Sequence, residues 1–232
     1  MKILFINHVG LMKFINYLLV LIILFLNSCG QISNDKTKSG LIKQVKLEDS
    51  IHKDLPYLNN GNLSPHYLLK DAKEKEMGFN TIENGFDSLI IRFWYGYVFS
   101  EKEQVVEIVS VKSIWTATIY TLTKKYYLNT DSVISIDKKI QIRVPKSGWS
   151  EFLHKLLNSN VLTLPSYESI PNYNLSNDAS GINVQIATKK SYRMYFYPCP
   201  INNITNIWQA KKIEEIMLLL ENELNFKQIS KF

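Results

Sequence analysis

One segment of this chain is apolar on both sides of any strand that it could form. Between Asp87 and Phe99, one parity carries leucine, isoleucine, phenylalanine and tyrosine, and the other carries isoleucine, tryptophan and valine around Arg92. Successive side chains of a strand point to opposite faces, so such a run has to be covered on both sides by other elements. The segment therefore predicts a central strand of a sheet.

The other elements follow from period and turn chemistry. Ser64-Pro65 supplies an N-cap and a first-turn proline, and Gly78 a stop, which predicts a short helix over 65–76. Short polar links between successive apolar segments favour an antiparallel meander. We expect further strands at 104–111, 114–126, 132–144, 182–188 and 191–197, and further helices at 148–158 and 204–224.

These elements predict a single α+β domain over residues 63–232. It would be a curved antiparallel sheet of about six strands, with helices packed on one face and a helix at the C-terminal end. Residues 41–62 mix charges with proline, asparagine and glycine without a sustained period, which indicates an irregular lead-in. The polar stretch 160–181, rich in proline and asparagine, is expected to be a long loop.

The N-terminal part has the pattern of an export signal. Residues 14–26 form an apolar run of 13 residues behind Lys13. A membrane-spanning helix needs about 20 apolar residues, whereas the core of a signal peptide needs about 7–15. An uncleaved membrane helix over residues 3–26 is the alternative, but Lys13 within it would cost about 2.5–3.5 kcal/mol. We therefore predict that residues 1–28 are a signal peptide.

The apolar run ends in Leu26-Asn27-Ser28-Cys29, which resembles the lipobox of bacterial lipoprotein precursors. Leu26, Ser28 and Cys29 match that motif, whereas Asn27 is bulkier and more polar than usual at its position. The resemblance implies that the Cys29 thiol receives a diacylglyceryl group, that cleavage precedes it, and that the new amine is acylated, for example by palmitate. Two or more acyl chains, at about 0.8 kcal/mol per buried CH₂, hold a protein firmly on a membrane. Residues 29–62 would then be a lipidated tether and lead-in.

The same resemblance bears on location. In such lipoproteins an aspartate directly after the cysteine retains the protein in the inner membrane; Gly30 stands there instead, which favours the outer membrane. Only Asp35 supplies acid close behind Cys29, so a periplasm-facing domain is expected rather than a surface-exposed one. Arg-Phe-Trp from Arg92, Gly148-Trp149, the segment 192–198 and a closing helix together resemble uncharacterised lipoproteins of the Bacteroidota, a resemblance that implies no activity.

Charge and residue usage exclude several classes. Lys and Arg outnumber Asp and Glu by 27 to 21, and this surplus is spread along the chain, which argues against a nucleic-acid partner. Two cysteines exclude a disulfide scaffold and a multi-cysteine zinc site. His52, His66 and His154 lack metal-ligand spacing and are expected on the surface.

Catalytic and cofactor motifs are not recognisable either. The carboxylate pairs, Glu101/Glu103, Asp131/Asp137 and Glu168/Asp178, fall in or beside predicted turns, where acids are ordinarily solvated. We therefore expect no cofactor and favour a non-catalytic binding or structural module of the cell envelope, its partner a protein or a saccharide. An immunity or inhibitor lipoprotein and a hydrolase of unrecognised type stay open as alternatives.

Arginine is used sparingly and always in a predicted strand, at Arg92, Arg143 and Arg193. Trp94 follows Arg92 and Tyr195 follows Arg193 two residues later, on the same strand face. One hypothesis is an arginine–aromatic face, made of these four residues, that binds an anionic or saccharide ligand. The other, which we favour, is internal pairing, for example of Arg92 with Glu107, together with cation–π packing.

Asp-Ser followed by an apolar residue recurs at Ser50, Ser88 and Ser132. The pattern resembles the sites at which Bacteroidota O-glycosylate exported proteins. Since a glycan requires a loop, Ser50 and Ser132 are the candidate sites. Asp-Ser is also common turn chemistry.

Overall fold

The computed structural model describes residues 51–96, 102–126, 133–175 and 181–228, which form one α+β domain. Cys29, Ser50 and Ser132, the predicted lipidation and glycosylation sites, lie outside these residues. In the described part of the chain, no helix has the length and apolar character needed to cross a membrane. The elements in chain order are β1 (His52–Asp54), α2 (Pro65–Leu68), α3 (Lys70–Met77), β2 (Leu89–Tyr95), β3 (Lys102–Val111), β4 (Ile114–Tyr126), β5 (Val133–Arg143), α4 (Trp149–Asn158), the 3₁₀ turn η1 (Tyr167–Ser169), β6 (Gly181–Thr188), β7 (Ser191–Pro198), the 3₁₀ turn η2 (Pro200–Asn203) and α5 (Trp208–Leu224).

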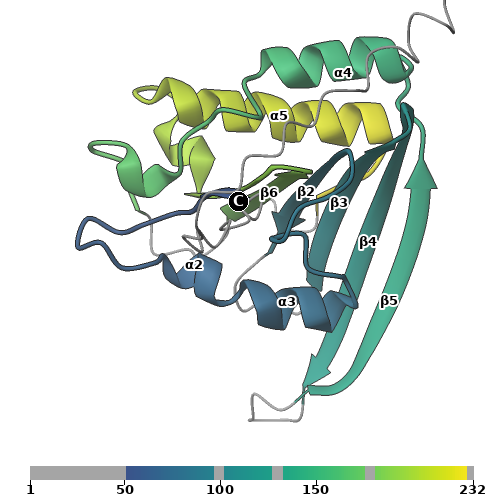
Figure 1. Ribbon diagram of the computed structural model, residues 1–232, viewed down its shortest axis with the longest axis horizontal. Helices are drawn as coiled ribbons and strands as arrows, with labels where there is room; N and C mark the ends of the chain where they lie inside the picture. Colours follow the sequence, from purple (N-terminus) through teal and green to yellow (C-terminus); the bar gives the residue numbers. More distant parts are fainter. Residues whose placement is uncertain (1–50, 97–101, 127–132, 176–180, 229–232) are drawn as a thin grey trace, which may run out of the picture. The chain divides into compact units, whose positions relative to one another are not determined.

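The strands form one sheet in the order β1-β7-β6-β2-β3-β4-β5 (Figure 1). The predicted α+β class is confirmed, with seven strands where about six were expected. β1 is the added strand, and it pairs parallel with β7, so the sheet is not purely antiparallel. β1 lies in the segment 41–62, which was predicted to be irregular. Its three residues are all exposed, and it is a strand only through backbone pairing with β7. Backbone pairing leaves no apolar pattern in the sequence, which is why the strand was not predicted.

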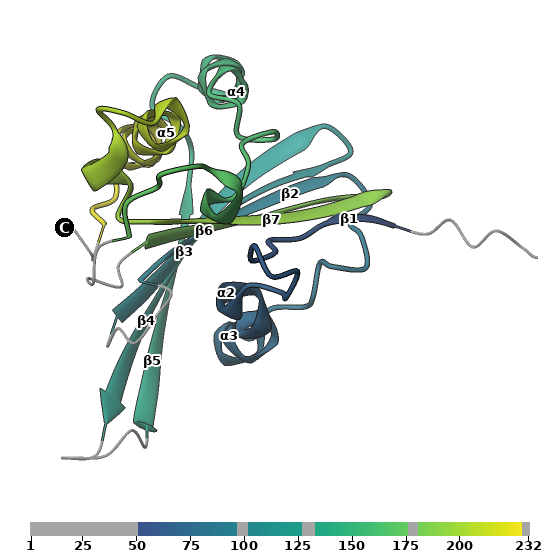
Figure 2. The ribbon, with the colours of Figure 1, turned by 90° about the vertical axis from the view of Figure 1, so that its left-hand side faces the viewer.

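β2 lies inside the sheet between β6 and β3, as its two-sided apolar pattern predicts. Ile91 and Phe93 pack with residues of α4 and α5, on what we call the α5 face. Ile90 and Trp94 pack with Met77 of α3, on the opposite face, the α3 face. Helices thus cover both faces of the sheet and not one as expected (Figure 2). The reason is β2 itself, since apolar side chains on both parities are buried only if both sides are covered.

The helix ends follow local chemistry. Pro65 lies in the first turn of α2, and Gly78 ends α3 with a left-handed φ of 67°, a conformation that costs glycine little. The single helix expected over 65–76 is divided at Leu69 into α2 and α3. α5 begins at Trp208 and not at residue 204, because residues 204–206 form a turn and Ile207 is extended, with φ −124° and ψ 107°.

Candidate functional site

Arg92 lies on the α3 face, and its side chain is only 4% exposed. Its Nε donates a hydrogen bond of 2.7 Å to Oε2 of Glu107, the residue opposite it on β3. Its Nη1 donates to the carbonyl of Asn80 at 3.1 Å and lies 3.4 Å from Oε1 of Glu74. The guanidinium carbon lies 4.5 Å from the centroid of the Phe79 ring. The structure thus supports the internal role that we favoured, including the pairing with Glu107.

Arg92 is one member of a larger set of buried and half-buried ion pairs that connect α3, Glu83 and the sheet, which we call the α3 ion cluster. Its cations are Lys70, Lys73, Arg92 and Lys124, and its acids are Glu74, Glu76, Glu83, Glu103 and Glu107. Glu103, expected in a solvated turn, is 1% exposed, because β3 begins at Lys102, two residues earlier than expected, and carries this side chain beneath α3. Lys124 lies 2.7 Å from Glu103 and 2.7 Å from Glu76.

The pKa values in this cluster reflect burial opposed by partners. Burial raises the pKa of Glu74, although Lys70 and Arg92 act against it. Burial acts in the same direction on Glu83, but hydrogen bonds from Lys53, Lys70 and Tyr67 outweigh it and lower its pKa to about 2. Each acid has a cationic partner, which is the condition under which buried charges are tolerated. We interpret the α3 ion cluster as the set of ion pairs that holds α3 against the sheet.

Trp94 is held on the same face. Its indole Nε1 donates to Oε1 of Gln185 at 2.9 Å, and Nε2 of Gln185 donates to Oε1 of Glu74 at 3.1 Å. The ring is 1% exposed. A buried tryptophan with its N–H satisfied has no surface to offer a ligand, so its function here is packing.

Arg193 and Tyr195 lie on the α5 face and fasten the loop that follows α4. Arg193 donates from its two terminal nitrogens to the carbonyls of Leu162 and Leu164, each at 2.6 Å. The Tyr195 hydroxyl donates to the carbonyl of Val161 at 2.8 Å. These bonds satisfy backbone carbonyls of a segment without regular structure, as buried backbone requires. Both residues therefore position the loop.

The two arginine–aromatic pairs do not form one ligand-binding face. Arg92 lies opposite Gln185 of β6, whereas Arg193 lies opposite Ile186, the next residue along the same strand. Adjacent strand residues point to opposite faces, so each pair is on one face and the two pairs are on different faces. The spacing of two residues predicted each pair correctly, but the register between strands was not visible in the sequence.

The loop over 159–175 also completes the edge of β7. β1 reaches only as far as Arg193, so the rest of β7 has no strand neighbour on that side among the described residues. Ser166 lies there instead: its Oγ accepts a hydrogen bond of 3.0 Å from the backbone N–H of Phe196. The Tyr173 hydroxyl donates to the carbonyl of Pro198 at 2.8 Å. The loop predicted from composition is therefore an ordered cover for an exposed sheet edge.

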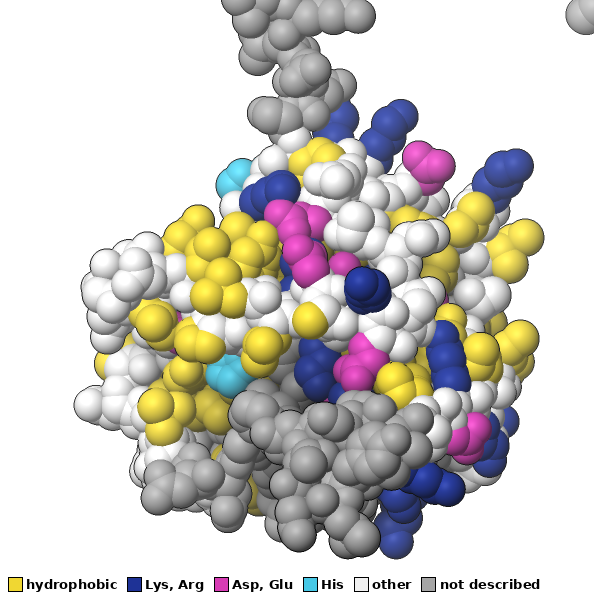
Figure 3. Space-filling view, turned by 90° about the horizontal axis from the view of Figure 1, so that it is seen from below, with side chains coloured by type: hydrophobic (Ala, Val, Ile, Leu, Met, Phe, Trp, Pro, Cys, Tyr) yellow, Lys and Arg dark blue, Asp and Glu magenta, His cyan; other side chains and the backbone are white. Residues whose placement is uncertain are grey.

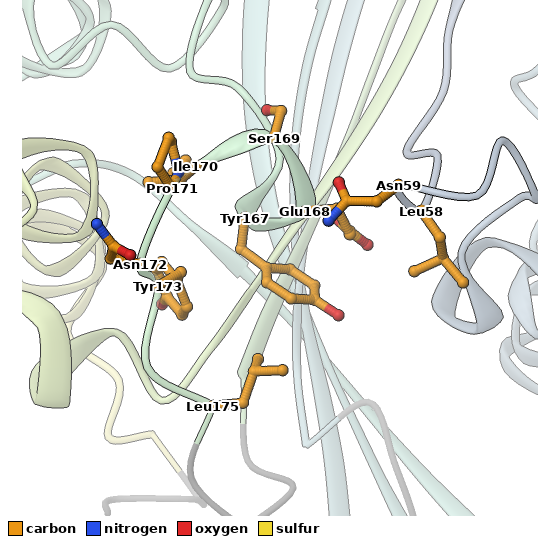
Figure 4. A pocket seen from close by; sticks show the side chains of 10 residues that line it. All are labelled: Leu58, Asn59, Tyr167, Glu168, Ser169, Ile170, Pro171, Asn172, Tyr173 and Leu175. Atoms are coloured by element: carbon orange, nitrogen blue, oxygen red, sulfur yellow. The ribbon is translucent and has the colours of Figure 1, made fainter.

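A groove lies between this loop and residues 54–59, and we call it the edge groove. It consists of two hollows, of about 560 Å³ and about 230 Å³, which share Glu168 and Ser169 in their linings. In Figure 4 the ring of Tyr167 is central, with Leu58 and Asn59 on one side and Tyr173 on the other. Concave sites of this size with aromatic walls and a few polar groups are typical of small-molecule binding.

Glu168 is the charged residue common to both hollows. One carboxylate oxygen, Oε2, accepts a hydrogen bond from Ser166 Oγ. The other, Oε1, is shielded from solvent and has no hydrogen-bond partner among the residues that the structure describes. A shielded carboxylate oxygen without a donor costs free energy.

Aromatic rings form the wall behind Tyr167. Its centroid lies 5.6 Å from that of Tyr173 and 5.9 Å from that of Phe196, both at steep interplanar angles. His66 stacks on Phe196 at 3.6 Å, and its burial lowers its pKa to about 4, so the ring is neutral at pH 7. The expected surface position is therefore wrong for His66, because α2 packs it against β7.

The sequence does not predict the edge groove as a site, although it does predict the loop over 160–181 that forms one of its walls. In the sequence, Glu168 is recognisable only as a carboxylate near a predicted turn. Tyr167 and Tyr173 lie in a polar loop and follow no helical or strand periodicity, so they give no signal of a shared site. Within the described ranges no group of three His, Cys, Asp or Glu side chains is placed to hold a metal ion.

Comparisons with protein families, curated proteins and solved structures found no match to this chain.

Proposed function

We propose that this protein is a lipoprotein of the bacterial envelope, anchored through Cys29, whose domain binds a short saccharide or similar hydroxyl-rich ligand in the edge groove. The leader with its Leu26–Cys29 motif supports the anchoring. The observation that carries the binding function is the edge groove itself, in which the Glu168 carboxylate lies on one side of the Tyr167 ring and Tyr173 lies on the other. Sugars offer both hydroxyl donors and apolar ring faces, and this groove has an acceptor and aromatic surfaces for them.

Backbone segments held by hydrogen bonds form the walls of the edge groove, and such preformed walls favour binding. Leu58 is held by a hydrogen bond of 2.8 Å from its N–H to the carbonyl of Asn62, within a turn at Gly61. On the other side, Asn174 and Asn203 exchange two hydrogen bonds of 2.8 and 3.0 Å between backbone and amide groups. A site with preformed walls loses less conformational entropy on binding.

The test measures binding by isothermal titration calorimetry, with the full-length chain in detergent and the neutral tetrasaccharides maltotetraose, cellotetraose and chitotetraose. Glu168→Gln keeps the size of the side chain but removes its charge, and should weaken binding by about 1.5–3 kcal/mol, or roughly tenfold to a hundredfold. Tyr167→Ala should cost more than about 1 kcal/mol. Trp208→Ala, an exposed aromatic residue on α5, is the matched control and should bind normally.

If none of the sugars binds, or if Glu168→Gln binds as tightly as the parent chain, the groove does not have this function. The anchor is tested separately. Cys29→Ser should abolish incorporation of a palmitate analogue and release the protein from membranes, whereas persistence of Cys29→Ser in the membrane fraction would refute the lipoprotein assignment.

A further inference from the structure

β5 is the outermost strand of the sheet at the end opposite β1 (Figure 1). It is long, with residues Val133–Arg143, and in the described part of the chain no strand pairs with its outer edge. β1, at the other end, is three residues long. A long edge strand exposes a row of backbone N–H and C=O groups that can pair with another strand.

The side chains of β5 are distributed unequally between its faces. Ile136, Ile140 and Ile142, which share the α3 face, are 45%, 56% and 73% exposed, and Val144 next to them is 69% exposed. Figure 3 shows hydrophobic side chains between lysines and arginines along the right-hand side, the side on which β5 lies in Figure 1. The other face of β5 carries Asp137, Lys139, Gln141 and Arg143.

Lysine on an edge strand usually prevents pairing, but Lys138 is occupied within its own domain. Its Nζ donates to the carbonyl of Met77 and lies over the rings of Phe79 and Tyr120, 5.4 and 5.2 Å from their centroids. By contrast, neither Asp137 nor Arg143 has an ion-pair partner among the described residues. The apolar row and these two charges are thus the groups that β5 offers to a partner.

We propose that the partner is a second copy of this chain, paired antiparallel through β5 about a two-fold axis at Ile140. In this register Ile140 faces Ile140 of the second copy, Lys139 faces Gln141, and Asp137 faces Arg143, so two opposite-charge pairs form on one face. On the other face, the exposed isoleucines of both copies come together. A two-fold axis requires such self-complementarity of a single surface.

Charge selects this register over its neighbours. An axis at Lys139 places the two Lys139 side chains directly opposite each other, and an axis at Lys138 does the same for Lys138. An axis at Gln141 sets Lys139 against Arg143. Like charges in directly opposed positions destabilise an antiparallel pair, whereas opposite charges stabilise it. Around Ile140 no two like charges are opposed, and sheets from two copies become continuous.

The first experiment is sedimentation velocity of the full-length chain in detergent at about 50 µM, where a micromolar Kd leaves most chains dimeric. Asp137→Arg replaces both ion pairs with repulsion and should raise the dimer Kd at least about tenfold. Asp137→Arg combined with Arg143→Asp restores opposite charges in exchanged positions and should restore the dimer. Asp137 is exposed and Arg143 is half-buried, and neither belongs to the hydrophobic core, so these changes leave the core intact.

The second experiment reports the register. Ile140→Cys places two thiols at the two-fold axis and should give a disulfide-linked dimer on mild oxidation, above the level of the parent chain. Leu218→Cys, on α5 with 45% exposure, is the control and should not. A monomer at about 50 µM, a dimer unaffected by Asp137→Arg, or equal cross-linking at positions 140 and 218 would each overturn the proposal.

Discussion

Removal of the Arg92 guanidinium tests whether the α3 ion cluster fastens the helix to the sheet. Arg92→Met keeps a side chain of similar length that can pack under Phe79, but it leaves the acids facing that position without this cation. Glu74 retains Lys70 and Gln185 as partners. Among the residues that the structure describes, Glu107 retains only the Tyr120 hydroxyl as a hydrogen-bond partner, at 3.3 Å. The cost should therefore come mainly from Glu107.

The magnitude follows from the geometry. Two unit charges about 4 Å apart interact by about 4 kcal/mol at an effective dielectric constant of about 20. Breaking a buried pair by removing one partner typically costs about 3–5 kcal/mol, because the remaining charge stays buried. We expect a loss in this range for Arg92→Met, a large part of the stability of a domain of this size.

The assay is urea unfolding at pH 7, followed by tryptophan fluorescence. Lys139→Met, on the exposed face of β5, is the matched control and should change the free energy of unfolding by less than about 0.5 kcal/mol. The double variant Arg92→Met/Glu107→Met removes both charges and should be more stable than Arg92→Met alone by about 1–3 kcal/mol. A loss below about 1 kcal/mol for Arg92→Met, or no recovery in the double variant, would refute this reasoning.

Three further predictions concern packing, pH and the loop. Gly181→Ala should lower the free energy of unfolding by about 1–3 kcal/mol, because the added Cβ would lie 2.6 Å from the Phe196 ring and 2.8 Å from the carbonyl oxygen of Tyr197. An unchanged thermal unfolding temperature would contradict that contact. Burial lowers the pKa of His66 to about 4, so below pH 6.5 the unfolded state takes up a proton before the folded state does, and the free energy of unfolding should fall between pH 6.5 and 4. His66→Phe should remove this part of the pH dependence of the urea midpoints. Tyr195→Phe leaves the buried carbonyl of Val161 without its donor, so it should lower the free energy of unfolding by about 1–1.5 kcal/mol and speed proteolytic cleavage within residues 159–175. Tyr57→Phe, at an exposed tyrosine, is the control and should have neither effect.

The sequence alone was sufficient for the class of fold and for most elements. The two-sided apolar pattern of β2 required an interior strand, and the helical spacing in α4 and α5 predicted both helices at nearly their observed positions. These signals are local, because hydrophobic period and turn residues act over a few neighbouring positions. The opposed pair of Arg92 and Glu107 was also anticipated, since successive strands joined by a short link pair in a predictable order.

Tertiary structure decided what depends on register and on distant segments. β1 is a strand only because β7 lies beside it, and the helices lie on both faces because the two parities of β2 each need cover. A shift of one residue between β2 and β7 separates Arg92 and Arg193 onto opposite faces, and nothing in either strand by itself encodes that shift. The edge groove brings residues near 58 beside residues near 168, about a hundred positions apart, and such a juxtaposition arises only once the sheet between them has formed.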